Sequence, residues 1–310
     1  MFGGAQNMYD IVIVGAGTAG LSAAIYGVRA GKTVLVLESS TYGGQIINSP
    51  EVENYPGIAK TSGFEFATAL YEQATNLGAE IDFEEVIRIE KNGNDFIVFT
   101  EDGEIPCHSV ILATGAKNRP LGVEREEQMV GAGVSYCATC DGAFFRGQKT
   151  VVVGGGNTAL EDAEFLSNFC EKVYVVHRRD EFRGEQWLVN ALDKKENVEF
   201  VMDSVVTEIL GERSVEGIRI KNVKTDAVTD LDVTGIFVAI GQMPDNKSFE
   251  ALIDLDAGGY IKGQEDCKTS CDGVFVAGDC RTKTVRQLAT AAADGAVAGL
   301  AACEYVNKNN

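Results

Sequence analysis

Two cysteines separated by two residues have the types and spacing for redox chemistry. The thiols of Cys137 and Cys140 can close a small disulfide ring and reopen it. Where a helix runs through such a pair, its N-terminal amides lower a thiol pKa toward neutrality. Asp141 follows directly and is a candidate proton donor to a leaving thiolate. The same Cys-x-x-Cys spacing is also half of a zinc site, so the motif alone leaves both interpretations open.

The beginning of the chain predicts a nucleotide-binding unit. Tyr9 to Val14 is a continuous apolar run, typical of a buried parallel strand, and a glycine-rich turn follows it. A helix is expected over 21–30 and a second strand over 33–38, which ends in Glu38. In this setting the glycines let the backbone approach a pyrophosphate, and Glu38 can accept hydrogen bonds from ribose hydroxyls. The turn consists of Gly15, Ala16, Gly17, Thr18, Ala19 and Gly20.

The same pattern occurs a second time. A strand over 150–153 leads into Gly154, Gly155, Gly156, Asn157 and Thr158, and a helix is expected over 160–169. A further strand over 173–177 ends in His177, where the first unit has Glu38. Arg178, Arg179 and Arg183 come next, and such a cationic cluster suits the 2′-phosphate of an NADP(H) ribose. The alternative is a solvated face on which the arginines pair with nearby acids.

The remaining segments predict that the second unit is inserted into the first. Strands over 110–115 and 236–241 end alike in small residues, and a third strand over 273–277 ends in Gly278-Asp279. Residues 42–57 look like loop, and helices are expected over 64–77 and, in an alanine-rich run, over 284–305. Two polar, proline-containing segments, 117–120 and 243–247, mark the crossings.

We therefore expect an α/β fold of two Rossmann-like, three-layer ββα domains. The first, discontinuous dinucleotide-binding domain would comprise 1–117 and 247–310, and the inserted domain 118–246 would carry the Cys-x-x-Cys motif.

Composition narrows the possible partners. The net charge of −19 opposes binding to the phosphate backbone of nucleic acid, and no apolar run is long enough to span a membrane. Residues 1–10 carry no positive charge and do not resemble a signal peptide. With eight cysteines and no export signal, the expected location is the cytoplasm. Cys107, Cys170, Cys280 and Cys303 are expected to be small buried hydrophobes, Cys267 and Cys271 surface thiols, and Trp187 a packing residue.

Taken together, these motifs resemble low-molecular-weight thioredoxin reductases from about Tyr9 to Tyr305. The resemblance rests on Ala113-Thr114-Gly115, the split unit ending in Gly278-Asp279, the arginine cluster and Cys137-Ala138-Thr139-Cys140-Asp141. It implies a homodimer that contains FAD, with no metal, and uses NADPH to reduce thioredoxin, which would dock near Phe144 and Phe145. Cys280 departs from the aliphatic residue usual in the family.

The resemblance also assigns residues to each cofactor. FAD contacts fall on Gly15, Gly17, Thr18, Ala19, Gly20, Glu38, Gly43, Gly44, Gln45, Asn54, Ala113, Thr114, Gly115, Gly278, Asp279, Arg286 and Gln287. NADPH contacts fall on Gly154, Gly156, Asn157, Thr158, His177, Arg178, Arg179 and Arg183.

The resemblance further implies that Cys140 faces the flavin, Asp141 handles the proton and Cys137 attacks thioredoxin. Since the dithiol and the NADPH motif lie in one inserted domain, we expect that domain to rotate between half-reactions.

Three alternatives remain open. Cys137 and Cys140 could form a four-thiolate zinc site with Cys267 and Cys271 in a non-catalytic nucleotide-binding protein. A flavin-dependent relative could oxidise small dithiols with oxygen, or take electrons from ferredoxin, but neither has a use for the arginine cluster. The larger glutathione- and lipoamide-type reductases carry an added dimerisation domain, for which 310 residues leave no room.

Overall fold

The computed structural model describes residues 8–49 and 51–309. The expectation for residues 1–10 therefore falls largely outside the described part of the chain. The chain divides into two compact units, of which unit 1 combines the residues up to Lys117 with those from Met243 onward, and unit 2 spans Asn118–Gln242. Residues 243–246 belong to unit 1 rather than to the inserted segment, because Asn246 is buried there and its amide donates to the carbonyls of Gly259 and Cys280.

Unit 1 is built on a seven-stranded sheet in the order β3-β2-β1-β6-β5-β4, with β17 also paired to β6. Strands β1, β2, β3, β6 and β17 run parallel, whereas β4 and β5 extend β6 as an antiparallel meander. The strands are β1 (Tyr9–Val14), β2 (Val34–Leu37), β3 (Glu80–Asp82), β4 (Val86–Asn92), β5 (Asp95–Thr100), β6 (Glu104–Leu112) and β17 (Val274–Val276).

The first strand explains why its sequence is continuously apolar. Ile11 and Ile13 enter the hydrophobic core on one face of the sheet, and Val12 and Val14 enter the core on the other face. Because successive side chains of a strand point to opposite faces, a strand that is covered on both sides needs apolar residues throughout.

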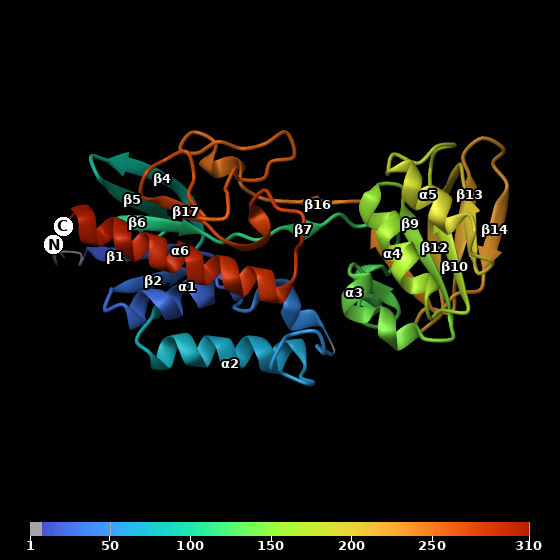
Figure 1. The fold of residues 1–310 in the computed structure, drawn as a ribbon, viewed down its shortest axis with the longest axis horizontal. Helices are drawn as coiled ribbons and strands as arrows, with labels where there is room; N and C mark the ends of the chain where they lie inside the picture. The colour runs from blue at the N-terminus through green and yellow to red at the C-terminus, as the bar shows by residue number, and fades with distance from the viewer. Residues whose placement is uncertain (1–7, 50, 310) are drawn as a thin grey trace. The chain divides into compact units, whose positions relative to one another are not determined.

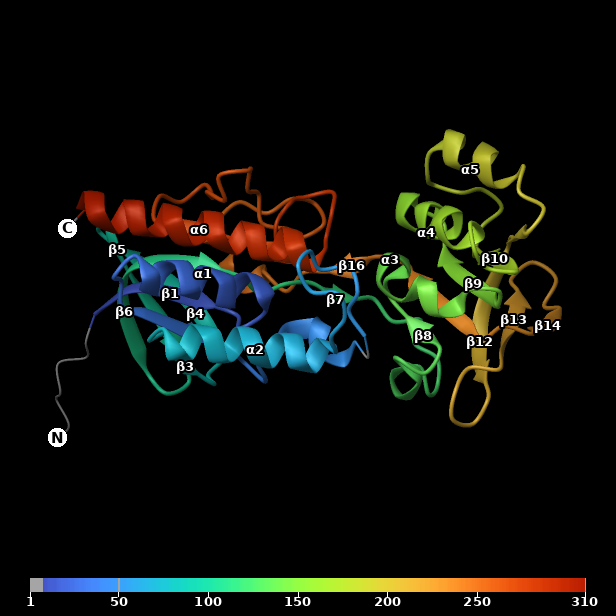
Figure 2. The ribbon, with the colours of Figure 1, turned by 60° about the horizontal axis from the view of Figure 1, so that its bottom comes forward.

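Helices α1 (Thr18–Arg29) and α6 (Leu288–Asn309) pack together against unit 1's sheet, and α2 (Gly63–Asn76) lies beside α1 (Figure 1). The view of Figure 2 shows the same layer of three helices. A Cβ atom at Gly295 would lie 2.2 Å from the carbonyl oxygen of Ala19, so the close approach of α6 to α1 requires glycine there.

The alanine-rich run does not begin as a helix at residue 284, as expected, because α6 begins at Leu288. The residues before it make tertiary contacts instead: Lys283 Nζ is paired with Asp294, and the Arg286 guanidinium donates to the carbonyls of Asp279 and Arg281. Residues 42–49 and 51–57 are mostly loop, interrupted by the 3-10 helix η1 (Gly44–Asn48).

Unit 2 repeats the plan of unit 1. Its five-stranded parallel sheet has the order β11-β10-β9-β15-β8, and a separate three-stranded antiparallel sheet has the order β12-β13-β14. The expected fold class of two Rossmann-like α/β units is confirmed. The elements are β8 (Val134–Ser135), α3 (Ala138–Asp141), β9 (Lys149–Gly154), α4 (Asn157–Ser167), β10 (Lys172–Val176), α5 (Gln186–Leu192), β11 (Val198–Val201), β12 (Ser204–Leu210), β13 (Gly217–Asn222), β14 (Val228–Leu231) and β15 (Gly235–Ala239).

The two segments that connect the units pair with each other. Strands β7 (Lys117–Asn118) and β16 (Gln242–Met243) form a two-stranded sheet of their own. Short 3-10 helices are also present at η2 (Glu127–Met129), η3 (Gly142–Phe145), η4 (Lys247–Phe249) and η5 (Gly278–Cys280). No helix within residues 8–49 and 51–309 is both long and apolar enough to cross a membrane.

Candidate active site and nucleotide sites

The two cysteines of the Cys-x-x-Cys motif form a disulfide with each other. Cys137 is the N-cap residue of α3, and Cys140 lies within that one-turn helix, with a Cα–Cα distance of 5.3 Å between them. Fully buried Ala138 anchors the turn in the core of unit 2, whereas both cysteines stay partly accessible. The structure therefore presents a redox-capable disulfide at the surface of this unit.

Asp141 closes the same turn and is held by a serine that sequence reasoning missed. Ser135 Oγ donates to Asp141 Oδ2 at 2.6 Å, and Asp141 Oδ1 is buried without a hydrogen-bond partner. Burial raises the pKa of Asp141, and the Ser135 hydrogen bond works in the opposite direction by stabilising the carboxylate. A carboxyl group whose pKa is raised can carry a proton at higher pH than an ordinary aspartate, which suits a proton donor.

The first glycine turn is shaped to receive a phosphate group. A Cβ atom at Gly20 would lie 1.9 Å from the carbonyl oxygen of Gly15, so the helix can begin this close to β1 only with glycine. Gly17, the N-cap of α1, has open space where a side chain would stand, above the first amides of the helix that contains Thr18 and Ala19. At the end of β2, Glu38 Oε2 accepts the Ala16 amide at 2.9 Å, which fixes the carboxylate beside the turn.

Several other residues assigned to FAD are brought to this end of unit 1. Gly43 forms an isolated β-bridge with Gly17. A Cβ atom at Gly44 would lie 3.4 Å from the Cα atom of Gly17. The Gln45 amide donates to the carbonyl of Ala116, next to Gly115. The Asn54 amide lies 3.3 Å from Gln287 Oε1, which joins the loop after η1 to the start of α6.

The carboxyl ends of β6 and β17 meet at the same edge of the sheet. The Ala113 amide donates to Val14 and the Ala277 amide to Leu112, so Ala113-Thr114-Gly115 and Gly278-Asp279 leave neighbouring strands together. Asp279 Oδ1 is buried without a hydrogen-bond partner, although Lys283 Nζ lies 3.8 Å away. Burial raises the pKa of Asp279, and Lys283 and Arg286 oppose that change. An orphaned buried oxygen beside an open glycine turn fits a dinucleotide that supplies the missing donor.

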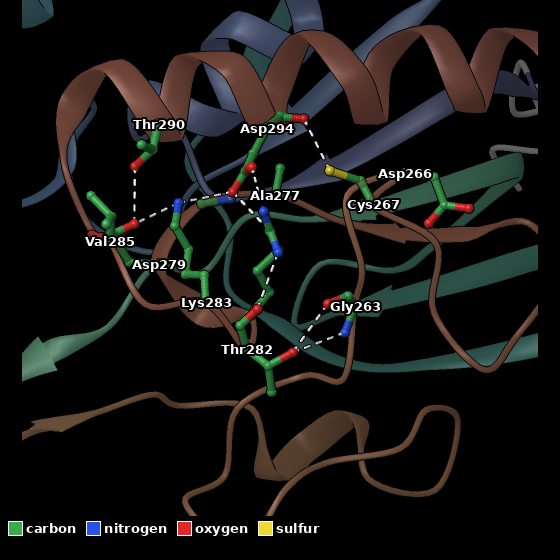
Figure 3. A network of polar contacts seen from close by, with 12 residues as sticks. Gly263, Asp266, Cys267, Ala277, Asp279, Thr282, Lys283, Val285, Thr290 and Asp294 are labelled. Carbon is green, nitrogen blue, oxygen red and sulfur yellow. Dashed lines mark hydrogen bonds and ion pairs between the residues drawn. The ribbon is translucent and has the colours of Figure 1, made fainter.

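Behind Asp279 lies a buried ionic network that the sequence did not reveal. Asp294, on α6, accepts the Gly278 amide at 3.0 Å and pairs with Arg281 and Lys283, while its own carbonyl receives the Cys267 thiol (Figure 3). No local pattern marks Asp294, because it stands in an otherwise alanine-rich run.

The second glycine turn in unit 2 repeats the geometry of the first. A Cβ atom at Gly154 would lie 2.4 Å from the carbonyl oxygen of Ala239, and Gly156, the N-cap of α4, again has open space around its Cα atom. Asn157 Oδ1 accepts the Glu185 amide at 2.8 Å, and Thr158 follows in the first turn of α4. The amides of Arg183 and Gly184 donate to Gly155, which brings the arginine segment to this turn.

His177 is buried, unlike the three arginines that follow it. Its ring is 5% exposed, occupies the place where a Cβ atom of Gly155 would stand, and stacks on Phe182. Burial lowers the pKa of His177, and the three neighbouring arginines lower it further against a hydrogen bond with the Glu181 backbone. The ring is therefore neutral, and the exposed cations are Arg178, Arg179 and Arg183.

Phe144 and Phe145 differ in exposure, and Trp187 differs from its expectation. Phe144 is exposed as expected, but Phe145 packs edge-on against Phe237 in the core of unit 2. Trp187 is 61% exposed rather than packed: it lies in the first turn of α5, and the buried residues of that helix are Leu188 and Leu192.

The cysteines outside the disulfide follow the sequence expectation with one exception. Cys107, Cys170, Cys280 and Cys303 are buried, as expected for small apolar residues, and Cys271 is half-buried. Cys267 is fully buried in unit 1 rather than at the surface, and burial raises the pKa of its thiol to about 12. The four-thiolate zinc interpretation would need four free thiolates. Cys137 and Cys140 are instead joined in a disulfide, and Cys267 is a buried thiol. Within the residues that the structure describes, no group of three or more His, Cys, Asp and Glu side chains could hold a metal ion.

Known proteins resemble this chain over nearly its full length. A family model described as pyridine nucleotide-disulphide oxidoreductase matches residues 9–296. A thioredoxin reductase of Peptoclostridium acidaminophilum is 42% identical, over 98% of this chain and 99% of its own, and a 34.2 kDa protein in the rubredoxin operon of Clostridium pasteurianum is 41% identical, over 97% and 98%. The crystal structure of thioredoxin reductase from Streptococcus pyogenes superposes with a TM-score of 0.93 at 42% identity, covering 98% of this chain and 100% of that one. The chain therefore belongs to the pyridine nucleotide-disulphide oxidoreductase family.

Proposed function

We propose that this protein is an NADPH-dependent flavoprotein that reduces the disulfide of thioredoxin through Cys137 and Cys140. The observation that carries the proposal is the Cys137–Cys140 disulfide in a unit that also holds a glycine turn and three exposed arginines. The relatives named thioredoxin reductase, at about 40% identity over nearly the whole chain, support the same substrate.

The residues of unit 1 suit FAD. The open space at Gly17, the neighbouring Glu38 carboxylate and the orphaned Asp279 oxygen would hold the pyrophosphate and the hydroxyl groups of the ligand. When bound, a flavin there would take two electrons from a reduced pyridine nucleotide and supply them to a disulfide. In unit 2, the amides above Gly156 would hold the pyrophosphate of the nucleotide.

The arginines would select the phosphorylated form of that nucleotide. Arg178, Arg179 and Arg183 are exposed beside the second glycine turn, and guanidinium groups bind a phosphate dianion with paired, charge-assisted hydrogen bonds. The ring of His177 packs against Gly155 and, because its pKa is lowered, adds no positive charge to the site at neutral pH.

The two cysteines would divide the exchange reaction between them. The Cys137 thiolate attacks one sulfur of the thioredoxin disulfide, which forms a mixed disulfide and releases the other thioredoxin sulfur as a thiolate. The Cys140 thiolate then attacks Cys137, which re-forms the internal disulfide and releases reduced thioredoxin. Asp141 would supply or accept the proton that a leaving thiolate requires. Thioredoxin would dock near exposed Phe144, while Phe145 supports this segment from the core.

We also infer a rotation of unit 2 between half-reactions and a homodimeric assembly. Both chain crossings between the units run through the short β7–β16 ribbon. Because this ribbon has few residues, it could act as a hinge. On unit 1, Tyr26, Val297 and Leu300 are exposed apolar side chains on the paired helices α1 and α6, a surface suited to a second copy.

An anaerobic titration tests the function directly. We expect NADPH to bleach the yellow, flavin-loaded protein, NADH to do so poorly, and oxidised thioredoxin to restore the colour. Equal bleaching by NADH would contradict the assignment of the arginines. If bleached protein stayed bleached after thioredoxin was added but regained colour with a small disulfide, the substrate would be another disulfide.

A further inference from the structure

Ser135 has a buried hydroxyl group to which the proposed function assigns no role. Ser135 ends β8, two residues before Cys137, and is 4% exposed. Its Oγ donates to Asp141 Oδ2 at 2.6 Å and accepts the Cys137 amide at 3.1 Å. One side chain thus joins the acid of the motif to the backbone of the first cysteine.

We propose that Ser135 is a positioning residue that holds Asp141 Oδ2 and leaves Oδ1 as the oxygen that exchanges the proton. The proposal rests on the proposed disulfide chemistry and adds to it the choice between two otherwise equivalent carboxyl oxygens. Asp141 Oδ1 is buried and has no hydrogen-bond partner, which is costly for a carboxyl group unless the site uses that oxygen.

The short distance between Ser135 Oγ and Asp141 Oδ2 identifies the protonation state of Asp141 that Ser135 favours. A hydroxyl that donates to an ionised carboxylate makes a charge-assisted hydrogen bond, and these bonds are characteristically 2.5–2.7 Å long. Donation from Ser135 therefore stabilises the carboxylate form of Asp141, against the desolvation that favours the protonated form.

Ser135 can remain satisfied after Asp141 takes up a proton. A serine hydroxyl has one hydrogen, and the carbonyl oxygen of Cys137 lies 3.3 Å from Ser135 Oγ as a second acceptor. The hydrogen can turn from Asp141 to this carbonyl when the carboxyl group is neutral, while the Cys137 amide continues to donate to Oγ. The proton could then move between Asp141 Oδ1 and a cysteine sulfur, as Asp–COOH and S⁻ on one side and Asp–COO⁻ and SH on the other, while the Ser135 hydroxyl keeps an acceptor in both states.

Replacement of Ser135 by alanine tests this arrangement. In oxidised holoenzyme carrying ¹³C at the aspartate carboxyl carbons, the Asp141 signal is identified by its loss in Asp141→Asn and followed against pH. We expect the midpoint of this titration to move to higher pH in Ser135→Ala, because the carboxylate loses the hydrogen bond that Ser135 donates. Ser135→Thr keeps the hydroxyl and should keep the wild-type midpoint.

The matched control is Ser204→Ala, in the same unit. Ser204 is equally buried, at 4% exposed, and its hydroxyl donates to the carbonyl of Met202 at 2.9 Å. We expect no movement of the Asp141 midpoint in this variant. An unchanged midpoint in Ser135→Ala, or the same movement in Ser204→Ala, would overturn the proposal.

A second measurement separates this proposal from the choice of substrate. Prereduced enzyme is mixed with 5,5′-dithiobis(2-nitrobenzoate), and the exchange rate is recorded against pH. Ser135→Ala should move the pH profile in the same direction as the carboxyl titration, whether or not thioredoxin is the natural partner. Loss of thioredoxin reduction with an unmoved profile would count against Ser135 as the positioning residue, whereas a wild-type enzyme that ignores thioredoxin would count only against the proposed substrate.

Discussion

Arg281 binds the carboxylate of Asp294 through two hydrogen bonds, from Nε at 2.9 Å and from Nη2 at 2.8 Å (Figure 3). Lys283 Nζ adds a third contact at 3.0 Å, and all three side chains are buried. Burial alone would raise the pKa of Asp294, but the hydrogen bonds from Arg281 and Lys283 outweigh it and lower that pKa. The pairing anchors the turn after β17 to α6, and this turn carries Gly278 and Asp279.

Replacement of Asp294 by alanine should lower the free energy of unfolding by about 3–5 kcal/mol, because it removes the buried carboxylate that Arg281 and Lys283 share. Urea unfolding followed by circular dichroism measures this change. Glu304→Gln is the control on the same helix: its exposed pair with Lys308 should be worth no more than about 0.5 kcal/mol. Comparable losses in the two variants would contradict the account.

Serine at Cys140 should abolish the reduction of protein disulfides, because the internal disulfide can no longer close, while pyridine nucleotide should still bleach the bound flavin. Steady-state assays with thioredoxin and single-turnover bleaching measure the two effects. Cys271→Ser, which changes a half-buried thiol of unit 1, serves as the control and should keep full activity. Retained disulfide reduction in Cys140→Ser would refute the role of this pair.

Glutamine at Arg178 or at Arg179 should raise the KM for NADPH by roughly 10–100-fold, because one charge-assisted hydrogen bond to a phosphate contributes about 1.5–3 kcal/mol. The KM for NADH should change little. Arg213→Gln removes an exposed positive charge elsewhere in unit 2 and should leave both constants unchanged. A parallel rise for NADPH and NADH would show that these arginines do not recognise the 2′-phosphate.

Asp162, on α4, predicts a pH dependence of stability. Burial, with a smaller contribution from the charge of Glu161, raises its pKa from 3.8 to about 7. Between these values the folded state binds more protons than the unfolded state, so the free energy of unfolding falls as the pH rises from about 4 to about 7. Asp162→Asn removes this fall and should stabilise the protein above pH 7, by at most a few kcal/mol.

Urea unfolding at pH 4.5, 6 and 8 follows the difference between Asp162→Asn and the wild type. Asp193→Asn changes an exposed acid at the end of α5 in the same unit and should leave the pH dependence as it is. A constant difference between Asp162→Asn and the wild type at all three values would contradict the prediction.

The amino-acid sequence by itself determined the repeated order of strand, glycine turn, helix and strand. These features are local: Ile11 to Val14 are apolar at every position because both faces of the strand are covered, and Gly15 and Gly20 permit an approach that no side chain would allow. For these elements the residue types and their spacing were sufficient. The spacing of Cys137 and Cys140 likewise places both on one turn, but the structure decides that they form a disulfide rather than half of a zinc site.

Only the tertiary structure decided the burial and pairing of individual side chains. The sequence grouped His177 with three arginines as nucleotide contacts, but its ring is enclosed by Gly155 and Phe182, and this burial lowers its pKa. Cys267 is buried and Trp187 exposed, against expectation, because burial depends on which distant segments pack against a residue. The contacts of Ser135 with Asp141 and of Asp294 with Arg281 likewise arise from backbone turns that place polar atoms within 3 Å of each other. Neither residue spacing nor hydrophobic periodicity predicts such a contact, because it depends on the path of the folded backbone.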